Sequence, residues 1–397
     1  MMSRRRLGGL AAASLAVARA MAAALLVAVV VAPAPAPSLA AAGDDALAEA
    51  QRRVAANPRD PQALRALGDA FEVKGQPLEA RAAYLKALEL DSGLVEARAG
   101  LARVLAQAGD NAGALAEQRR VANLRPGDAE ARFLLGVMAL RAGQAEQAIA
   151  AWKETVQIQP NHVSALNDMG MALLQLDRSA EAIGPLEKAV AAAPSLVPAR
   201  TNLAYAYLRS GRPADAIKQY REVLDLTPED PDASRNLGLA YLQTKQPQDA
   251  IPLLRQAVRL RPTPEAIRDL GVALLEVKRA DEAELVLKMA VDASPEWGAA
   301  HVDLGRAQLA RGELEAARAS LQKGVSLDPK DAEGHLALGR VYARQREYAQ
   351  AWRQAREAEK LGHPGAKELL AELARVSKEP GRAEPAAPAT KARPDAR

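Results

Sequence analysis

The stretch that decides the fold is residues 129–162, AEARFLLGVMALRAGQAEQAIAAWKETVQIQPNH. It holds two apolar-patterned segments, separated at Gly143 and ended by Pro160. Glycine tolerates the left-handed conformation that commonly closes a helix, and proline cannot continue the helical hydrogen-bond ladder. The stretch therefore predicts two antiparallel amphipathic helices joined by a short turn.

The same pattern recurs along most of the chain. Prolines stand 34 residues apart, with one step of 33, at Pro126, Pro160, Pro194, Pro228, Pro262, Pro295 and Pro329. The pair Leu-Gly recurs at the same period at Leu67-Gly68, Leu135-Gly136, Leu237-Gly238, Leu270-Gly271, Leu304-Gly305 and Leu338-Gly339. A fixed period of this length is the signature of a solenoid. It predicts an all-α fold over residues 61–365, with nine repeats that start at 61, 95, 129, 163, 197, 231, 264, 298 and 332.

These residues closely resemble the tetratricopeptide repeat family, in an exported bacterial form. The resemblance implies a right-handed α-solenoid whose concave groove holds partner peptides. One departure concerns the first aromatic residue of the family pattern. In this chain that place holds Leu64, Arg98, Arg132, Leu166, Arg200, Ser234, Ile267, His301 and His335. We therefore expect looser or more polar packing at this position.

Both ends of the array differ from its middle. Residues 44–60 resemble a half-repeat, whose helix would cover the first repeat, and residues 366–377 carry an apolar stripe suited to cover the last one. Residues 378–397 are rich in proline, alanine and charge, so we expect a disordered tail.

Residues 1–40 have the character of a signal peptide. Ser3-Arg4-Arg5-Arg6 is a positive segment, and the apolar run Ala20–Ala32 has the length of a signal core. Small residues suited to cleavage follow at Ser38–Ala40 and Ala40–Ala42. These features predict a periplasmic or secreted protein. An uncleaved anchor in the inner membrane, with the array facing the periplasm, remains the alternative.

Composition and charge exclude several classes of function. The formal charge is +4, and four arginines lie in the first 40 residues, where there is no acid. The remaining 49 basic residues equal the 49 acidic ones. The array therefore lacks the excess of positive charge that is typical of proteins that bind nucleic acid. There is no cysteine, and the four histidines are dispersed. Because no catalytic or phosphate-binding motif occurs, we expect no catalytic, cofactor or metal site and no enzyme activity.

The candidate site is the concave groove in the middle repeats. The sixth position of five consecutive repeats is polar, with Asp168, Asn202, Asn236, Asp269 and Asp303. The ninth position of repeats three to seven is apolar, with Val137, Met171, Tyr205, Leu239 and Val272. By resemblance, the sixth-position residues form a polar ladder that holds an extended peptide by its backbone, beside an apolar floor. Alternatively, the polar residues serve neighbouring helices and the apolar ones pack between repeats.

These features predict a protein–protein interaction scaffold that binds partner segments, in the assembly of a cell-envelope or secretion complex. The alternative is an accessory or regulatory subunit of an envelope enzyme carried on another chain. The partners would be proteins, with membrane contact only if the N-terminal segment is not cleaved. The sequence does not indicate the oligomeric state.

Overall fold

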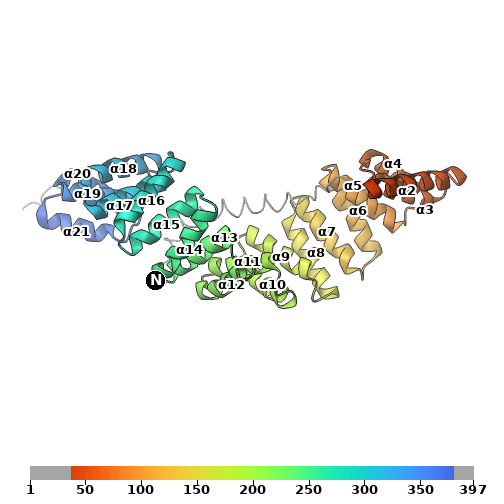
Figure 1. Ribbon diagram of the computed structural model, residues 1–397, viewed down its shortest axis with the longest axis horizontal. Helices are drawn as coiled ribbons and strands as arrows, with labels where there is room; N and C mark the ends of the chain where they lie inside the picture. Colours follow the sequence, from red (N-terminus) through yellow and green to blue (C-terminus); the bar gives the residue numbers. More distant parts are fainter. Residues whose placement is uncertain (1–36, 380–397) are drawn as a thin grey trace, which may run out of the picture. The chain divides into compact units, whose positions relative to one another are not determined.

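The computed structural model describes residues 37–379, with side chains from residue 44 onward, and these residues form helices without any strand (Figure 1). The all-α repeat fold predicted from the sequence is confirmed. The signal-like segment up to residue 36 and the tail from residue 380 lie outside the described residues.

Each repeat contributes two helices, A and B, joined by a turn of three residues or fewer. The A helices are α3 (Pro61–Val73), α5 (Val95–Gln107), α7 (Ala129–Arg141), α9 (Val163–Gln175), α11 (Val197–Arg209), α13 (Pro231–Gln243), α15 (Pro264–Glu276), α17 (Gly298–Arg311) and α19 (Ala332–Arg344). The B helices are α4 (Pro77–Leu90), α6 (Asn111–Leu124), α8 (Ala145–Ile158), α10 (Ser179–Ala192), α12 (Pro213–Leu226), α14 (Pro247–Leu260), α16 (Ala280–Ala293), α18 (Leu314–Leu327) and α20 (Tyr348–Lys360).

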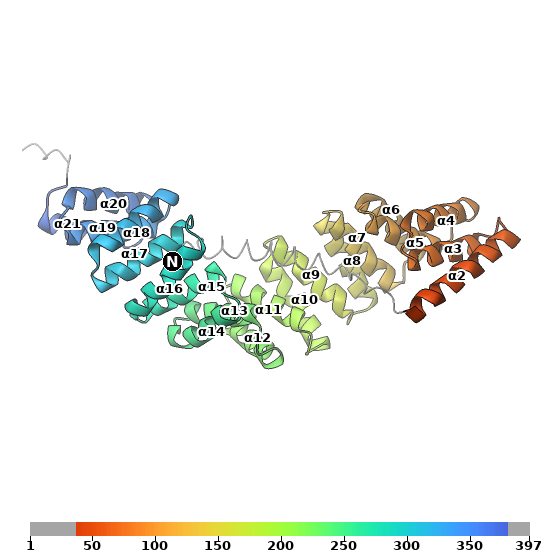
Figure 2. The ribbon, with the colours of Figure 1, turned by 45° about the horizontal axis from the view of Figure 1, so that its top comes forward.

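The chain divides into two compact units between Leu226 and Thr227. The N-terminal unit holds α2 to α12 and the C-terminal unit holds α13 to α21. Within each unit, every A helix packs on its own B helix, and each B helix packs on the next A helix (Figure 2). Each repeat therefore buries its apolar residues against its neighbours along the chain, as in other solenoids.

Two further helices flank the repeats. Helix α2 (Pro37–Ala56) packs on α3, and α21 (Ala366–Val376) packs on α19 and α20. Helix α2 begins at Pro37, earlier than the expected start at residue 44, so the candidate cleavage residues lie in its first turns. A proline is compatible with this place because the first residues of a helix have no intrahelical N–H partner.

The glycine of the Leu-Gly pair lets helix B approach helix A closely. A Cβ atom on Gly136 would lie 2.4 Å from Nε1 of Trp152, and one on Gly170 would lie 2.4 Å from Cγ of Leu186. Both large side chains are completely buried. Glycine recurs at this position because its missing Cβ leaves a packing notch on helix A. One large side chain of helix B fills that notch in each of these repeats.

The fourth position of the repeat is the place of the first aromatic residue in the family pattern. Polar side chains at this position form hydrogen bonds. Several donate to the carbonyl group six residues earlier, in the turn that precedes the A helix. The pairs are Arg98 with Ser92 at 3.0 Å, Arg200 with Pro194 at 2.7 Å, His301 with Pro295 at 2.8 Å and His335 with Pro329 at 3.1 Å. The expected polar packing is thus present in these four repeats, where it fastens the A helix to the preceding turn.

The residue that closes helix A adopts a left-handed conformation throughout the array. Five repeats use glycine there, including Gly143 with a φ of 74°. Four repeats use a side-chain-bearing residue, namely Asp177, Lys245, Lys278 and Arg346, with φ values from 58° to 63°. This conformation costs L-residues about 1–2 kcal/mol because Cβ approaches the following carbonyl oxygen.

We expect the substitution Lys278→Gly to raise the free energy of unfolding by about 0.5–1 kcal/mol, since relief of the left-handed strain exceeds the added entropy of the unfolded chain. Urea titration followed by circular dichroism measures the change. The matched control is Gly143→Lys, where a Cβ would meet nothing within 4 Å and only the backbone strain changes. It should lower stability by a similar amount. If both substitutions changed the free energy of unfolding in the same direction, the explanation by left-handed backbone strain would be wrong.

Candidate partner-binding surface

The sixth-position residues of the N-terminal unit form a short hydrogen-bonded chain. Asn202 on α11 donates from Nδ2 to Oδ1 of Asn167 on α9 at 3.1 Å. Asn167 in turn donates to Oδ1 of Asp168 at 3.1 Å. All three side chains are half-buried. Because an amide can both donate and accept, Asn202 keeps hydrogen-bonding capacity beyond its bond to Asn167.

Asp168 has an altered acidity. Burial raises the pKa of Asp168 above its usual value, although the hydrogen bond from Asn167 and the nearby His162 oppose this effect. Desolvation penalises the charged form of a carboxyl group. The charged form of Asp168 is therefore less favourable here than in water.

The equivalent aspartates of the C-terminal unit are engaged between repeats. Asp269 on α15 is 6% exposed and accepts from Nε of Arg235 on α13 at 2.6 Å. Burial raises the pKa of Asp269, and the charge and hydrogen bond of Arg235 act against it. The carboxylate of Asp269 therefore forms an ion pair with Arg235, which joins two consecutive A helices.

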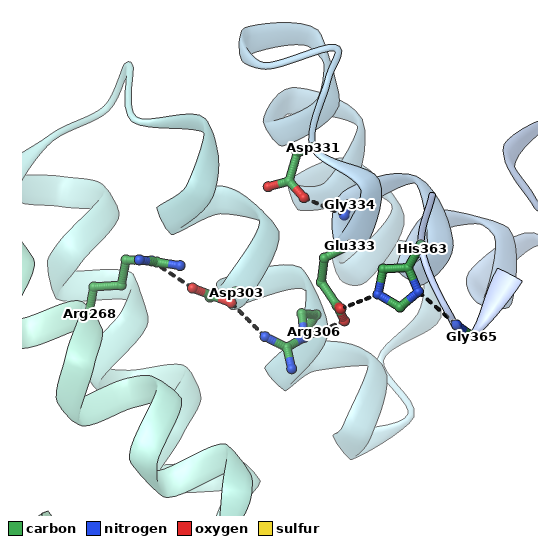
Figure 3. Close-up of polar contacts among 8 residues, drawn as sticks. All are labelled: Arg268, Asp303, Arg306, Asp331, Glu333, Gly334, His363 and Gly365. Atoms are coloured by element: carbon green, nitrogen blue, oxygen red, sulfur yellow. Dashed lines mark hydrogen bonds and ion pairs between the residues drawn. The ribbon is translucent and has the colours of Figure 1, made fainter. Parts of the chain in front are cut away.

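Asp303 on α17 is bound more extensively (Figure 3). It accepts from Nε of Arg268 at 2.7 Å and from a terminal nitrogen of Arg306 at 2.7 Å. Nε of Arg306 lies 3.1 Å from Glu333 on α19, whose other oxygen lies 2.9 Å from Nε2 of His363. Burial alone would raise the pKa of Glu333, but Arg306 and His363 hold it below its usual value. The chain of contacts links three A helices to the turn before α21.

The ninth-position residues are half-buried in both units, with Val137, Met171 and Tyr205 in the N-terminal unit and Leu239 and Val272 in the C-terminal unit. Asn236, in the C-terminal unit, is half-buried as well. A leucine stands three residues after each ninth position and is half-buried too. These leucines are Leu140, Leu174, Leu208, Leu242 and Leu275. We call Val137, Leu140, Met171, Leu174, Tyr205 and Leu208 the apolar strip of the N-terminal unit.

Sequence reasoning missed two components of this surface. The twelfth-position leucines were detectable, because residues three apart lie on one face of a helix. The fifth-position partners Asn167, Arg235 and Arg268 were harder to find. Each reaches the sixth position of the next repeat, 34 or 35 residues away. A search for polar pairs at that spacing would have found them.

The described residues contain neither a group of acidic, histidine or cysteine side chains able to hold a metal ion nor a helix long and apolar enough to cross a membrane. His301 and His335, which occupy equivalent places in neighbouring repeats, each bond to the turn before their own helix.

Comparison with known proteins places these repeats in one family. The model described as "Tetratricopeptide repeat" matches residues 43–95, 74–129, 99–161, 139–196, 201–264 and 245–297, and a second, described as "TPR repeat", matches residues 305–345. No curated protein matches the sequence.

Several solved structures are similar to this one. A tetratricopeptide repeat protein from Parabacteroides merdae ATCC 43184 has 18% identity and a TM-score of 0.50, and covers 62% of this chain and 98% of its own. MamA from Desulfovibrio magneticus RS-1 has 22% identity and a TM-score of 0.40, covering 42% of this chain and 94% of its own. A chain of the APC/C hetero-tetramer Cut9-Hcn1 has 17% identity and a TM-score of 0.49, covering 79% of this chain and 76% of its own. At these identities the likeness concerns the fold alone.

Proposed function

Because the chain belongs to the tetratricopeptide repeat family, whose members generally mediate protein–protein interactions, we propose that it is a scaffold that binds an extended segment of a partner protein. The observation that carries the proposal is the apolar strip beside Asn167 and Asn202 in the N-terminal unit. Partly exposed apolar side chains in a row are typical of binding surfaces, and adjacent amides can pair with a peptide backbone.

The proposal places the main contacts on Val137, Met171, Tyr205, Asp168 and Asn202. Leu239, Val272 and Asn236 would offer a similar surface in the C-terminal unit. Asp269 and Asp303 would contribute less, since their carboxylates are buried and already paired with arginines.

We further propose that the protein is exported and acts in the assembly of an envelope or secretion complex. The basic segment Ser3-Arg4-Arg5-Arg6 followed by the apolar run Ala20–Ala32 supports export, as in a signal peptide. The assembly role rests on this location together with the scaffold architecture, because fold by itself does not specify a pathway.

A photo-crosslinking amino acid placed at Met171 tests the surface. In living cells it should capture one defined segment of a partner, recovered in the periplasmic fraction, and Asn202→Ala with Tyr205→Ser should lower the adduct yield about fivefold or more, as expected for central contacts. The control is the same crosslinker at Lys188, which is exposed on helix B of the same repeat.

Equal yields of the adduct at Met171 and Lys188, or no change in the double variant, would overturn the assignment of the surface. Recovery of the chain only in the cytoplasm would overturn export.

A further inference from the structure

Three large apolar side chains of the first repeat are exposed. Val73 and Leu78 are each 75% exposed, and Leu85 is 40% exposed. Val73 ends α3 and Leu78 lies in the first turn of α4, so the two flank the short turn of residues 74–76. Leu85 follows Leu78 by seven residues, a spacing that puts both leucines on one face of α4. We call Val73, Leu78 and Leu85 the first-repeat patch.

The first-repeat patch is particular to this repeat. At the same three positions the other eight repeats carry charged residues, amides or alanine. In the second repeat these residues are Gln107, Ala112 and Arg119. Because eight repeats form the same pair of helices without large apolar residues there, the packing of a repeat does not require them. Exposed apolar residues that the fold does not need are typical of a contact surface.

Helix α2 brings the N-terminal segment of the chain to this patch. It packs on α3 (Figure 2), and Asp44 in its first half pairs with Lys74, which directly follows Val73. Only residues 33–36 separate the apolar run 20–32 from Pro37, where α2 begins. The segment that resembles a membrane-targeting signal therefore joins the fold beside the first-repeat patch.

The size of the patch and the character of the N-terminal run favour a lipid surface as the occupant. A stable dimer buries roughly 800 Å² on each partner, far more than three side chains expose. Residues 20–32 contain no polar side chain, so a patch on one side of this run would leave most of its surface in water. A bilayer covers such a run on every side and offers the patch the same apolar surroundings.

The charges around the patch are balanced. Arg81 and Lys86 are exposed on α4, and so are Glu79 and Glu89. Attraction to anionic headgroups therefore contributes little, and contact of the apolar side chains with lipid has to supply the binding. The two cationic side chains can extend to the headgroups while their stems lie along the apolar surface.

We propose that the first-repeat patch docks on a lipid bilayer and holds the first repeat against it. Val73, Leu78 and Leu85 enter the boundary between headgroups and acyl chains, as the apolar residues of interfacial proteins do. The inference rests on the proposed targeting of the chain to a membrane by its N-terminal segment. The apolar strip belongs to repeats three to five, so the lipid contact and the partner contact involve different repeats.

A fluorescent label on the full chain tests the proposal. The chain has no cysteine, so Ala82→Cys, which lies on the exposed face of α4 between Leu78 and Leu85, can carry a single environment-sensitive label. The chain is reconstituted with vesicles of phosphatidylethanolamine and phosphatidylglycerol that contain a nitroxide-labelled lipid. The emission should shift to the blue, and nitroxide quenching should exceed that of the same label at Ala180→Cys about threefold or more, as expected for a side chain at the lipid interface. Ala180 is exposed on helix B of the fourth repeat.

Two pairs of substitutions separate docking by the patch from attachment through the N-terminal segment. Val73→Gln with Leu78→Ala introduces the residues of the second repeat and should reduce the quenching at residue 82 to the level at residue 180. The matched control is Leu285→Ala with Met289→Gln, which removes two apolar side chains that are 69% and 51% exposed on α16. It should leave the quenching unchanged. Circular dichroism should give the same unfolding midpoint for both pairs, because the replaced side chains are exposed.

The salt dependence distinguishes apolar docking from attraction by charge. Quenching at residue 82 should persist at about 0.5 M salt, since salt screens charges and does not weaken apolar contact. Loss of the quenching at this salt concentration would overturn docking by the first-repeat patch.

Several other results would overturn the proposal. Equal quenching at residues 82 and 180, or full quenching in Val73→Gln with Leu78→Ala, would reduce the effect to general adsorption. A blue-shifted label without vesicles would assign the patch to a second copy if the shift depends on protein concentration, and to a segment of the same chain if it does not. A chain that sediments with the vesicles while its label at residue 82 stays unquenched would refute the docking and leave membrane targeting intact.

Discussion

Replacing Trp152 with alanine is expected to lower the free energy of unfolding by about 3–5 kcal/mol, among the largest losses for a single substitution in this protein. Trp152 is the largest completely buried side chain, and its Nε1 donates to the carbonyl oxygen of Phe133 at 3.2 Å. Alanine would leave a cavity over Gly136 that helix packing cannot close, and would leave that carbonyl without this donor.

The loss should begin locally. Each repeat contacts only its neighbours, so unfolding should start at α7 and α8. Urea titration measures the total effect, and amide hydrogen exchange should lose protection first in these two helices.

The matched control is Trp152→Leu. Leucine fills the equivalent notch in four other repeats, where Leu186, Leu254, Leu287 and Leu321 lie over a glycine. This substitution should cost about 2 kcal/mol, less than alanine, because it leaves a smaller cavity. A change below about 0.5 kcal/mol for the alanine variant would contradict the packing role of Trp152.

Replacing Asp303 with alanine is expected to cost about 3 kcal/mol, since removal of one member of a buried ion pair leaves the other charges uncompensated. The side chain of Asp303 is only 3% exposed and lies between Arg268 and Arg306. These arginines are 21% and 30% exposed, so water can recover part of their hydration. The expected loss in the free energy of unfolding therefore lies at the lower end of the range for breaking a buried ion pair.

Thermal and urea unfolding measure the effect of this substitution, and two variants serve as controls. Asp281→Ala removes an 86% exposed partner of Arg311 and should cost no more than about 0.5 kcal/mol. Replacing Asp303 and Arg268 together by apolar residues should cost less than Asp303→Ala alone, since Arg306 still pairs with Glu333 and no charge is left unpaired. Equal costs for Asp303→Ala and Asp281→Ala would refute the role of the buried carboxylate.

The recurring spacing of the sequence was sufficient to predict the repeat architecture. Helix A begins at Pro61, Val95, Ala129 and the later residues at which the repeats start in the sequence, because each repeat carries its own helix signals. The step of 33 residues appears as a shorter connection between Leu260 and Pro264, where Thr263 caps the next helix. Local signals repeated at a fixed distance leave few alternative folds.

The polar surface depended on contacts between repeats, which the period does not reveal. Asp168, Asn202, Asp269 and Asp303 occupy the same position, yet two lie in a half-buried amide chain and two in buried ion pairs. For Asn202, Asp269 and Asp303 the difference comes from the fifth position of the preceding repeat, which holds the amide of Asn167 or the guanidinium group of Arg235 or Arg268. Asp168 accepts instead from Asn167 of its own repeat.

The amino-acid sequence by itself determined the all-α repeat fold and the residues at which the repeats begin, because these follow from propensities and spacing within about one period. Only the tertiary structure decided which charges meet. Helix stacking brings side chains 34 or 35 residues apart into contact, so the sixth-position aspartate accepts from an amide in one repeat and from two arginines in another. The buried slot of Tyr84 arises in the same way, from Gly68 and Gly100 on two different helices.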